Sequence, residues 1–163
     1  MRINLGCGSY ILPGYDNFDK YPETSDVKYI DLDVLPLPFP SDYADEIRLN
    51  QVLEHVLYPL ELCNECQRVL KPGGLFIVDV PVYSFMIGHR RPRNTLGSFD
   101  CLWQDKKNPI YTGDGGFKLI RKYGCRRDGD KLFSFFFFRV SQIIRDFLHI
   151  LVYRHFVWEF KKK

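Results

Sequence analysis

The sequence has no long apolar run and almost no excess of charge. Of its 163 residues, 23 are Lys or Arg and 20 are Asp or Glu, which gives a formal net charge of +3. So mild an excess does not by itself indicate a nucleic-acid partner, and none is expected. No stretch of about eighteen apolar residues occurs, so no membrane span is predicted. The N-terminus also lacks the basic-then-apolar pattern of a secretory signal.

Cysteine is sparse and scattered, which argues against a disulfide-stapled fold. We expect the five cysteines to be reduced thiols in a cytoplasmic protein. Cys63 and Cys66 form one Cys-x-x-Cys pair, but no second pair completes a metal site, so no metal is predicted. Both fall on the apolar stripe of a predicted helix, which indicates core packing. The length allows one domain, residues 1–163.

A glycine-rich turn at the start of the chain is the most informative feature. An apolar strand from Ile3 to Leu5 runs directly into Gly6-Cys7-Gly8. Asp19 follows a second short strand that the sequence predicts from Tyr15 to Phe18. Glycine lets a ligand approach the backbone, and an acid at the end of the next strand can accept hydrogen bonds from a ribose diol. The pattern indicates a nucleoside-containing cofactor in a doubly wound α/β domain.

The spacing between turn and acid narrows the choice of cofactor. Dinucleotide-binding units place a full helix there, and its N-terminus holds the pyrophosphate. Here only residues 9–14 intervene, and Pro13-Gly14 would break a helix. A cofactor with ribose and adenine but no phosphate, such as S-adenosylmethionine, fits this spacing better. A nicotinamide-dependent oxidoreductase remains the less favoured alternative.

Further elements follow in the order expected of such a domain. The pattern predicts strands over Val27–Ile30, Ala44–Leu49 and Leu75–Val80, a helical turn over Gln51–Val56 and a helix from Pro59 to Leu70. A proline-rich loop covers residues 35–40, and Lys71-Pro72-Gly73-Gly74 is expected to separate the helix from the next strand.

The C-terminal third is predicted to close the sheet. Strands are expected over Phe117–Tyr123 and Lys131–Phe138, and an amphipathic helix over Val140–Leu151. Alternation of Phe156, Trp158 and Phe160 with polar or smaller neighbours predicts a half-buried last strand. The crowded aromatic residues could instead form a dimer face, so monomer and homodimer both stay open.

Several spaced motifs in the first half resemble the class I S-adenosylmethionine-dependent methyltransferases. They are Asn4-Leu5-Gly6-Cys7-Gly8, Asp19, Asp31-Leu32 followed by Leu-Pro-Phe-Pro, Leu53-Glu54-His55 and Arg68-Val69-Leu70-Lys71-Pro72-Gly73-Gly74. The resemblance covers residues 2–81 and is nearest to a small subgroup with a shortened first crossover. It implies a Rossmann-like, doubly wound, mostly parallel sheet with helices on both faces and an antiparallel C-terminal strand. It also implies a methyltransferase that uses S-adenosylmethionine.

The same resemblance implies roles for individual residues. Gly6 and Gly8 would let the cofactor approach, Asp19 would accept from the ribose hydroxyls, and Asp31 with the Leu32 amide would meet adenine. Asn50 would face the methionine or acceptor side. Asn4 and Cys7, at the same first turn, complete the set of residues expected to bind the cofactor.

Glu54 and His55 are the candidate catalytic residues, and three interpretations stay open. His55 could act as a general base, because its ordinary pKa lies near neutrality. Related 2′-O-methyltransferases of small RNAs and some quinone O-methyltransferases place magnesium ligands here, but their first glutamate is Gln51 in this chain. The third interpretation is that Glu54 and His55 orient the loop carrying Asn50.

Residues 82–116 are predicted to recognise the acceptor, with 1–81 forming the cofactor-binding half and 117–163 the closing strands and helix. His89-Arg90-Arg91-Pro92-Arg93 is a basic cluster that could bind an anionic group. The small domain favours a small-molecule, sugar or glycan-type acceptor methylated on oxygen or nitrogen. A non-catalytic relative that keeps the fold as a binding or scaffold protein is the other alternative.

Overall fold

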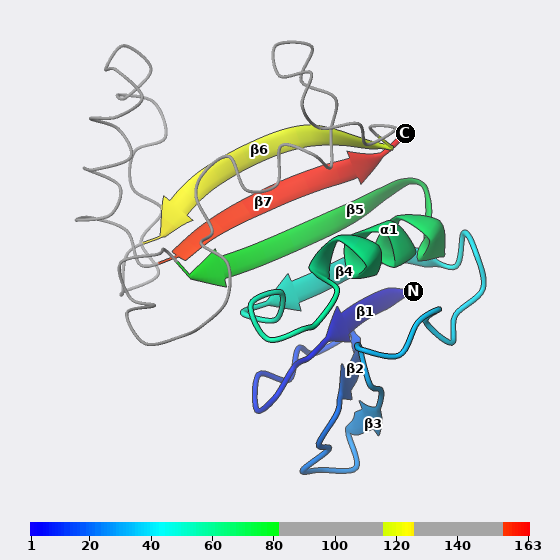
Figure 1. Ribbon diagram of the computed structural model, residues 1–163, viewed down its shortest axis with the longest axis vertical. Helices are drawn as coiled ribbons and strands as arrows, with labels where there is room; N and C mark the ends of the chain where they lie inside the picture. The colour runs from blue at the N-terminus through cyan, green and yellow to red at the C-terminus, as the bar shows by residue number, and fades with distance from the viewer. Residues whose placement is uncertain (82–115, 126–154) are drawn as a thin grey trace.

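The protein is built around one seven-stranded sheet with a helix on one face (Figure 1). The computed structural model describes residues 1–81, 116–125 and 155–163. The strands are β1 (Arg2–Leu5), β2 (Asp16–Asp19), β3 (Val27–Tyr29), β4 (Ala44–Asn50), β5 (Leu70–Pro81), β6 (Phe117–Cys125) and β7 (His155–Lys162), and the helix is α1 (Pro59–Val69). Their order is β3-β2-β1-β4-β5-β7-β6.

The sheet confirms the predicted fold class. Strands β1 to β5 pair in parallel, and β7 is antiparallel to both β5 and β6. The strand order reverses beside β1, which is the arrangement of a doubly wound domain. Within the described ranges, no helix has the length and apolar character needed to cross a bilayer. The predicted strand at Lys131–Phe138 and helix at Val140–Leu151 lie outside the described residues.

Helix α1 forms where the sequence predicts it, and it covers the centre of the sheet. Pro59 starts the helix, where its missing N–H leaves no hydrogen bond unmade. One stripe of the helix is fully buried and packs into the core with Phe76 and Val78 of β5: Leu62, Cys63, Cys66 and Val69. Neither Cys63 nor Cys66 forms a disulfide in this core, and burial raises the pKa of Cys66.

Two local predictions were wrong. Strand β5 begins at Leu70 rather than Leu75, and its pairing with β4 passes from Ala44↔Leu70 directly to Glu46↔Leu75. The residues 71–74 therefore form an irregularity inside the strand and do not separate it from the helix. Residues 51–56 form no helix: Gln51 has φ +56°, and the segment contains a turn in which the His55 amide donates to the Val52 carbonyl at 2.9 Å.

The short crossover between β1 and β2 is held by two buried asparagines instead of a helix. Nδ2 of Asn4 donates to the Tyr10 carbonyl at 3.0 Å and to Oδ1 of Asn17 at 2.8 Å. Asn17 in turn accepts from the Leu12 amide at 2.9 Å and donates to the carbonyls of Leu12 and Tyr15, both at 3.1 Å. These side chains provide the partners that a helix would otherwise give the backbone. The connection can therefore be short.

Strand β7 is more deeply buried than its sequence predicts. Trp158 and Phe160 lie in the core, as expected. Val157 and Glu159, on the opposite face, are also buried, so the strand is not half exposed along these residues. Glu159 is compensated there by Arg121 of β6, whose Nε lies 2.7 Å from the carboxylate. A buried charge is tolerated because it is paired.

Candidate functional site

The predicted cofactor residues gather at one edge of the sheet. Because β1 to β5 run parallel, their carboxyl ends meet at that edge. Figure 1 shows the turn after β1 and the ends of β4 and β5 on this side. Gly6, Asp19, Asp31 and Asn50 all lie at or just beyond such a strand end. The topology thus brings together residues that are spread over the first fifty positions.

The turn after β1 requires its glycines for two different reasons. Gly6 and Gly8 have φ of +66° and +49°, which L residues with a side chain rarely adopt. A Cβ on Gly6 would lie 2.7 Å from Cγ2 of Val52, so this position is also sterically closed. A Cβ on Gly8 would meet no atom within 4 Å. Gly8 therefore faces open space, as a ligand-binding position must.

Asp19 is oriented by the backbone on both sides of its carboxylate. Its Oδ2 accepts from the Gly8 amide at 2.7 Å, and its Oδ1 accepts from the Tyr21 amide at 2.9 Å. Each carboxylate oxygen can accept a second hydrogen bond. A ribose diol could therefore be bound by a carboxylate that is already fixed in place.

The loop after β3 presents a second ordered acid. Lys20 lies 2.8 Å from Oδ2 of Asp31, and the Asp33 amide donates to Oδ1 at 3.1 Å. The hydrogen bond from Lys20, followed by that from the Asp33 backbone, lowers the pKa of Asp31. The Leu32 side chain is buried in the core, which anchors this turn beneath the site.

Other members of the predicted cofactor set lie deeper. Asn4 is fully buried and holds the crossover, and its Oδ1 has no partner among the residues described. Cys7 is buried, its Sγ lies 3.4 Å from the Gly8 carbonyl, and burial, followed by the nearby Asp19 charge, raises its pKa. Asn50 is half-buried at the end of β4, in register with Asp79 of β5.

The segment between β4 and α1, residues 51–58, carries Glu54 and His55 and is here called the β4–α1 loop. Its first residue, Gln51, is tied to Asp79 of β5 twice, through its amide at 2.8 Å and through its side-chain Nε2 at 2.9 Å. Val52 packs against Gly6 at the floor of the turn. The loop is therefore fixed at its start to both β1 and β5.

Glu54 and His55 differ sharply in exposure. The Glu54 side chain is 4% exposed, whereas that of His55 is 70% exposed, and their nearest polar atoms are 4.0 Å apart. Burial, with a smaller contribution from Asp79, raises the pKa of Glu54 to about 7. Within the part of the chain that is described, Oε2 of Glu54 has no hydrogen-bond partner. Glu54 is thus a largely desolvated acid, and His55 is a group at the rim.

The described acidic and His side chains of this loop do not gather as a group of metal ligands. The Gln51 side chain is engaged with Asp79. Across residues 1–81, 116–125 and 155–163, no three His, Cys, Asp or Glu side chains converge on a point that could hold a metal ion.

Two residues at this edge were missed by the sequence analysis. Asp79 is the one acid inside the apolar stretch of β5, and such an isolated charge was a usable signal. Asp33 accepts from the Leu57 amide at 2.7 Å and joins the loop after β3 to the β4–α1 loop. Leu57 lies 24 residues after Asp33, so no local sequence pattern predicts this contact.

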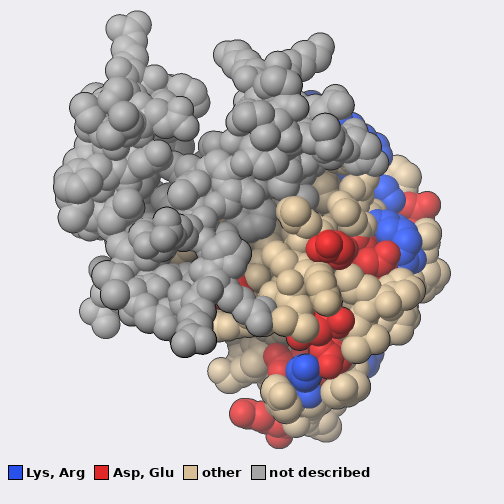
Figure 2. Space-filling view, in the orientation of Figure 1, with Lys and Arg blue, Asp and Glu red and all other residues tan. Residues whose placement is uncertain are grey.

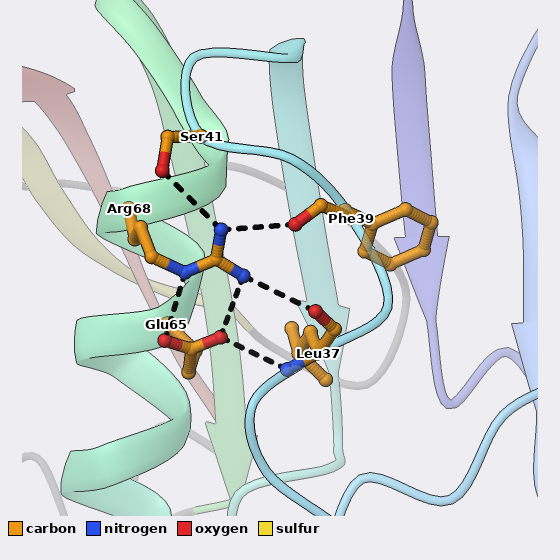
Figure 3. Close-up of polar contacts among 5 residues, drawn as sticks. All are labelled: Leu37, Phe39, Ser41, Glu65 and Arg68. Atoms are coloured by element: carbon orange, nitrogen blue, oxygen red, sulfur yellow. Dashed lines mark hydrogen bonds and ion pairs between the residues drawn. The ribbon is translucent and has the colours of Figure 1, made fainter.

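The proline-rich loop is held against α1 by an ion pair (Figure 3). Arg68 and Glu65 form a double contact at 2.9 and 2.8 Å. The Arg68 guanidinium also donates to the carbonyls of Leu37 at 3.1 Å and Phe39 at 2.9 Å, and Glu65 accepts from the Leu37 amide at 2.9 Å. The hydrogen bond from Arg68 lowers the pKa of Glu65.

Figure 2 shows acidic and basic side chains next to one another on the described part of this face. The ion pairs of the described residues include Lys20 with Asp31 and Lys71 with Asp45. The described part of this face therefore presents mixed charge and not a field of one sign.

Comparison with known proteins supports a methyltransferase domain in this chain. Residues 16–78 match a family model described as a methyltransferase domain. A probable S-adenosylmethionine-dependent methyltransferase from Mycolicibacterium smegmatis is 38% identical over 77 residues, which cover 46% of this chain and 28% of that protein. An uncharacterized methyltransferase from Mycobacterium leprae is 29% identical over 96 residues. The chain spans only 28–31% of the length of these curated relatives.

Solved structures share the fold at low identity. A putative sarcosine dimethylglycine methyltransferase from Galdieria sulphuraria superposes with a TM-score of 0.61 at 17% identity, covering 99% of this chain and 78% of its own. A putative methyltransferase from Haloferax volcanii, solved in complex with the Trm112 methyltransferase activator, gives 0.59 at 16%, with coverages of 99% and 81%. The family match over residues 16–78 and the sheet topology together support a class I S-adenosylmethionine-dependent methyltransferase domain, and they imply S-adenosylmethionine as its cofactor.

Proposed function

We propose that this chain transfers the methyl group of S-adenosylmethionine to oxygen or nitrogen of a small-molecule, sugar or glycan-type acceptor. The observation that carries the proposal is the Asp19 carboxylate, fixed by the Gly8 and Tyr21 amides beside the open space at Gly8. Residues 9–15 contain no helix, so a pyrophosphate would find no helix N-terminus here. This argues against the nicotinamide-dependent alternative.

The residues at the strand ends would act mainly by positioning. Asp19 would hold the ribose, Asp31 and the Leu32 amide the adenine, and Asn50 the methionine or acceptor side. When bound, the cofactor supplies a methyl group on a positively charged sulfur, so attack by the acceptor breaks an already activated carbon–sulfur bond. Holding the two reactants in line then provides most of the rate.

A base is needed only if the acceptor is a poorly ionised hydroxyl. His55 lies at the exposed rim and could take that proton, whereas Glu54 is largely shielded from solvent. His55→Ala should then lower turnover by about 10²- to 10⁴-fold with the affinity for S-adenosylhomocysteine unchanged. An unaltered turnover would leave Glu54 and His55 with the loop-orienting role.

Acceptor recognition is proposed for residues 82–116, most of which lie outside the described residues. The cluster Arg90, Arg91 and Arg93 favours an acceptor with a phosphate or carboxylate group. The double variant Arg90→Ala, Arg91→Ala should raise the acceptor KM and spare cofactor affinity. The difference should shrink at high salt, because exposed charges are screened beyond about 8 Å at physiological ionic strength. An equal KM at all salt concentrations would reduce the cluster to a solvated loop.

The proposal also includes a cytoplasmic location and a monomeric or homodimeric state. Cys7, Cys63 and Cys66 form no disulfide, which is typical of proteins in a reducing compartment. Sedimentation of the pure protein distinguishes the two assembly states.

Calorimetry tests the cofactor directly. The wild-type protein should bind S-adenosylhomocysteine and not NAD. Asp19→Ala should weaken binding by about 1–3 kcal/mol, because charge-assisted hydrogen bonds are lost. Asp16→Ala is the matched control, since this acid lies at the other end of β2 and pairs with Lys28. Binding of NAD alone would reject the proposal. A methyl-transfer screen over hydroxylated and amine metabolites then separates an enzyme from a non-catalytic binding protein.

A further inference from the structure

The β4–α1 loop is held differently at its two ends. At its start, Gln51 is bound to Asp79, and Val52, Leu53 and Val56 are buried in the core. At its end, the Leu57 side chain is 52% exposed, so apolar burial contributes little there. Two described hydrogen bonds hold this end: the Leu57 amide donates to Oδ1 of Asp33 at 2.7 Å, and the Tyr58 carbonyl accepts from the Leu62 amide of α1 at 3.0 Å. The first of them is the one that joins the loop to the turn after β3.

Asp33 belongs to the turn that presents the proposed adenine contacts. Its own amide donates to Oδ1 of Asp31 at 3.1 Å. Asp31 is therefore connected to Leu57 by two hydrogen bonds in series through one residue. Leu57 follows His55 by two positions and Glu54 by three. Any ligand that fixes Asp31 and Leu32 also fixes the acceptor of the hydrogen bond that ends this loop.

These two hydrogen bonds can make the β4–α1 loop more ordered when Asp31 is held by a ligand, without a change in the structure of the loop. A loop end held by exposed hydrogen bonds opens more easily than one held by buried packing, because an exposed hydrogen bond contributes little net stability. Restricting Asp33 lowers the entropy that the hydrogen bond must offset, and it lengthens the time that the loop stays closed. Order at the adenine end would thus extend to Glu54 and His55.

We infer that Asp33 is a positioning residue that couples occupation of the adenine end of the site to the order of the β4–α1 loop. The inference rests on the proposed function, since it takes Asp31 and Leu32 as the adenine contacts. Asp33 does not touch the reacting atoms in this assignment. It acts through the Leu57 amide on the position of His55.

Backbone amide exchange measured by NMR, with S-adenosylhomocysteine as the probe, tests the coupling without a known acceptor. The readout is the His55 amide, which bonds the Val52 carbonyl at 2.9 Å and does not contact Asp33. In the wild-type protein, saturating probe should slow this exchange by roughly 5-fold or more. Asp33→Ala should bind the probe with a Kd within about threefold of wild type but lose the slowing. Asp33→Asn keeps a side-chain oxygen that can accept the hydrogen bond, so this variant should retain the slowing of His55 amide exchange.

The controls separate the possible failures. Asp16→Ala, which removes an acid of similar exposure on β2, should behave as wild type. Asp33→Leu provides a second variant without an acceptor, should the alanine variant not fold. The inference is overturned if the probe still slows exchange of the His55 amide in both Asp33→Ala and Asp33→Leu. It is also overturned if Asp33→Asn loses this slowing as fully as Asp33→Ala does, or if the probe does not slow the exchange in the wild-type protein. A wild-type protein that does not bind the probe at all rejects the proposed function itself, and the inference falls with it.

Discussion

Asn4 of β1 and Asn17 of β2 are joined by a side-chain hydrogen bond of 2.8 Å. Both residues are buried, with exposed fractions of 0% for Asn4 and 4% for Asn17. The bond crosses between neighbouring parallel strands directly beneath the crossover that links them. Through it, the two strands and the connection share one set of hydrogen bonds. The turn that presents Gly8 to a cofactor is supported by this network.

Asn17→Ala should therefore destabilise the protein strongly. The change removes one of the two partners of Asn4 Nδ2, and it removes the Asn17 bonds to the Leu12 amide and to the carbonyls of Leu12 and Tyr15. Each unpaired buried group costs about 1–3 kcal/mol, so we expect a loss of roughly 2–4 kcal/mol in the free energy of unfolding. Urea denaturation measures it. Asn64→Ala, on the exposed side of α1, is the control. Equal stabilities would show that the crossover does not depend on this network.

The two glycines of the first turn should respond differently to alanine. Gly6→Ala introduces a positive-φ penalty and a clash with Val52, and should cost about 2–4 kcal/mol of stability. Gly8→Ala carries the φ penalty alone, about 1 kcal/mol, but places a methyl group in the open space of the proposed site. It should lower S-adenosylhomocysteine affinity by roughly tenfold or more.

Gly14→Ala is the control for that comparison. Gly14 also has positive φ, at +77°, and open space around it, but it lies in the crossover and not in the turn. Gly14→Ala should lose about as much stability as Gly8→Ala, and calorimetry should show an unchanged affinity for S-adenosylhomocysteine. If Gly8→Ala bound the probe as tightly as Gly14→Ala, Gly8 would not line the cofactor site.

Glu54 should make stability depend on pH in the direction opposite to that of most acids. Its pKa is raised from 4.5 to about 7 in the folded protein, so between these values the folded state binds more protons than the unfolded state. Stability conferred by the neutral acid is present at low pH and is lost as pH rises through about 7.

Glu54→Gln should abolish this dependence. The variant should match the wild type near pH 4.5 and exceed its free energy of unfolding by about 1–3 kcal/mol at pH 8. Urea denaturation between pH 4.5 and 8 measures the difference. Glu61→Gln, exposed in the first turn of α1, is the control. A constant difference between wild type and Glu54→Gln across this range would contradict the assignment.

Arg68 should contribute far more than a surface ion pair. Arg68→Ala removes the guanidinium that donates to the carbonyls of Leu37 and Phe39, and it releases Glu65 (Figure 3). We expect a loss of about 2–3 kcal/mol by urea denaturation, and Arg68→Lys should recover only part of it, because ammonium cannot reproduce the planar fork. Lys28→Ala, which breaks the exposed pair with Asp16, should cost at most about 1 kcal/mol. Similar losses of stability in Arg68→Ala and Lys28→Ala would show that the contacts of Arg68 with the proline-rich loop add no stability beyond that of a surface ion pair.

The sequence predicted best where a feature is local. The Gly8 and Asp19 pairing and the start of α1 at Pro59 follow from residues that are close in the chain, and the structure places them as expected. The start of β5 was misplaced because glycine and proline in 71–74 resemble a turn, whereas the pairing of Leu70 with Ala44 decides the boundary.

Contacts between distant residues were the features that sequence patterns could not give. Burial of Glu159 depends on Arg121, 38 residues away, and the place of Asp33 depends on Leu57. Asn4 was assigned by its position beside the turn, but its hydrogen bonds are set by the register of β1 against β2. That register is a property of the assembled sheet.

The abridged crossover also bears on how the domain folds. The contact between Gly8 and Asp19 closes a loop of only 11 residues, whereas Gln51 and Asp79 are 28 apart and Asp42 and Lys162 are 120 apart. Because the entropy lost on closure grows with loop length, the contact between Gly8 and Asp19 has the smallest closure cost of the three. This corner is accordingly a low-contact-order structure, whereas the sheet is completed only when the C-terminal strand β7 has paired with β5.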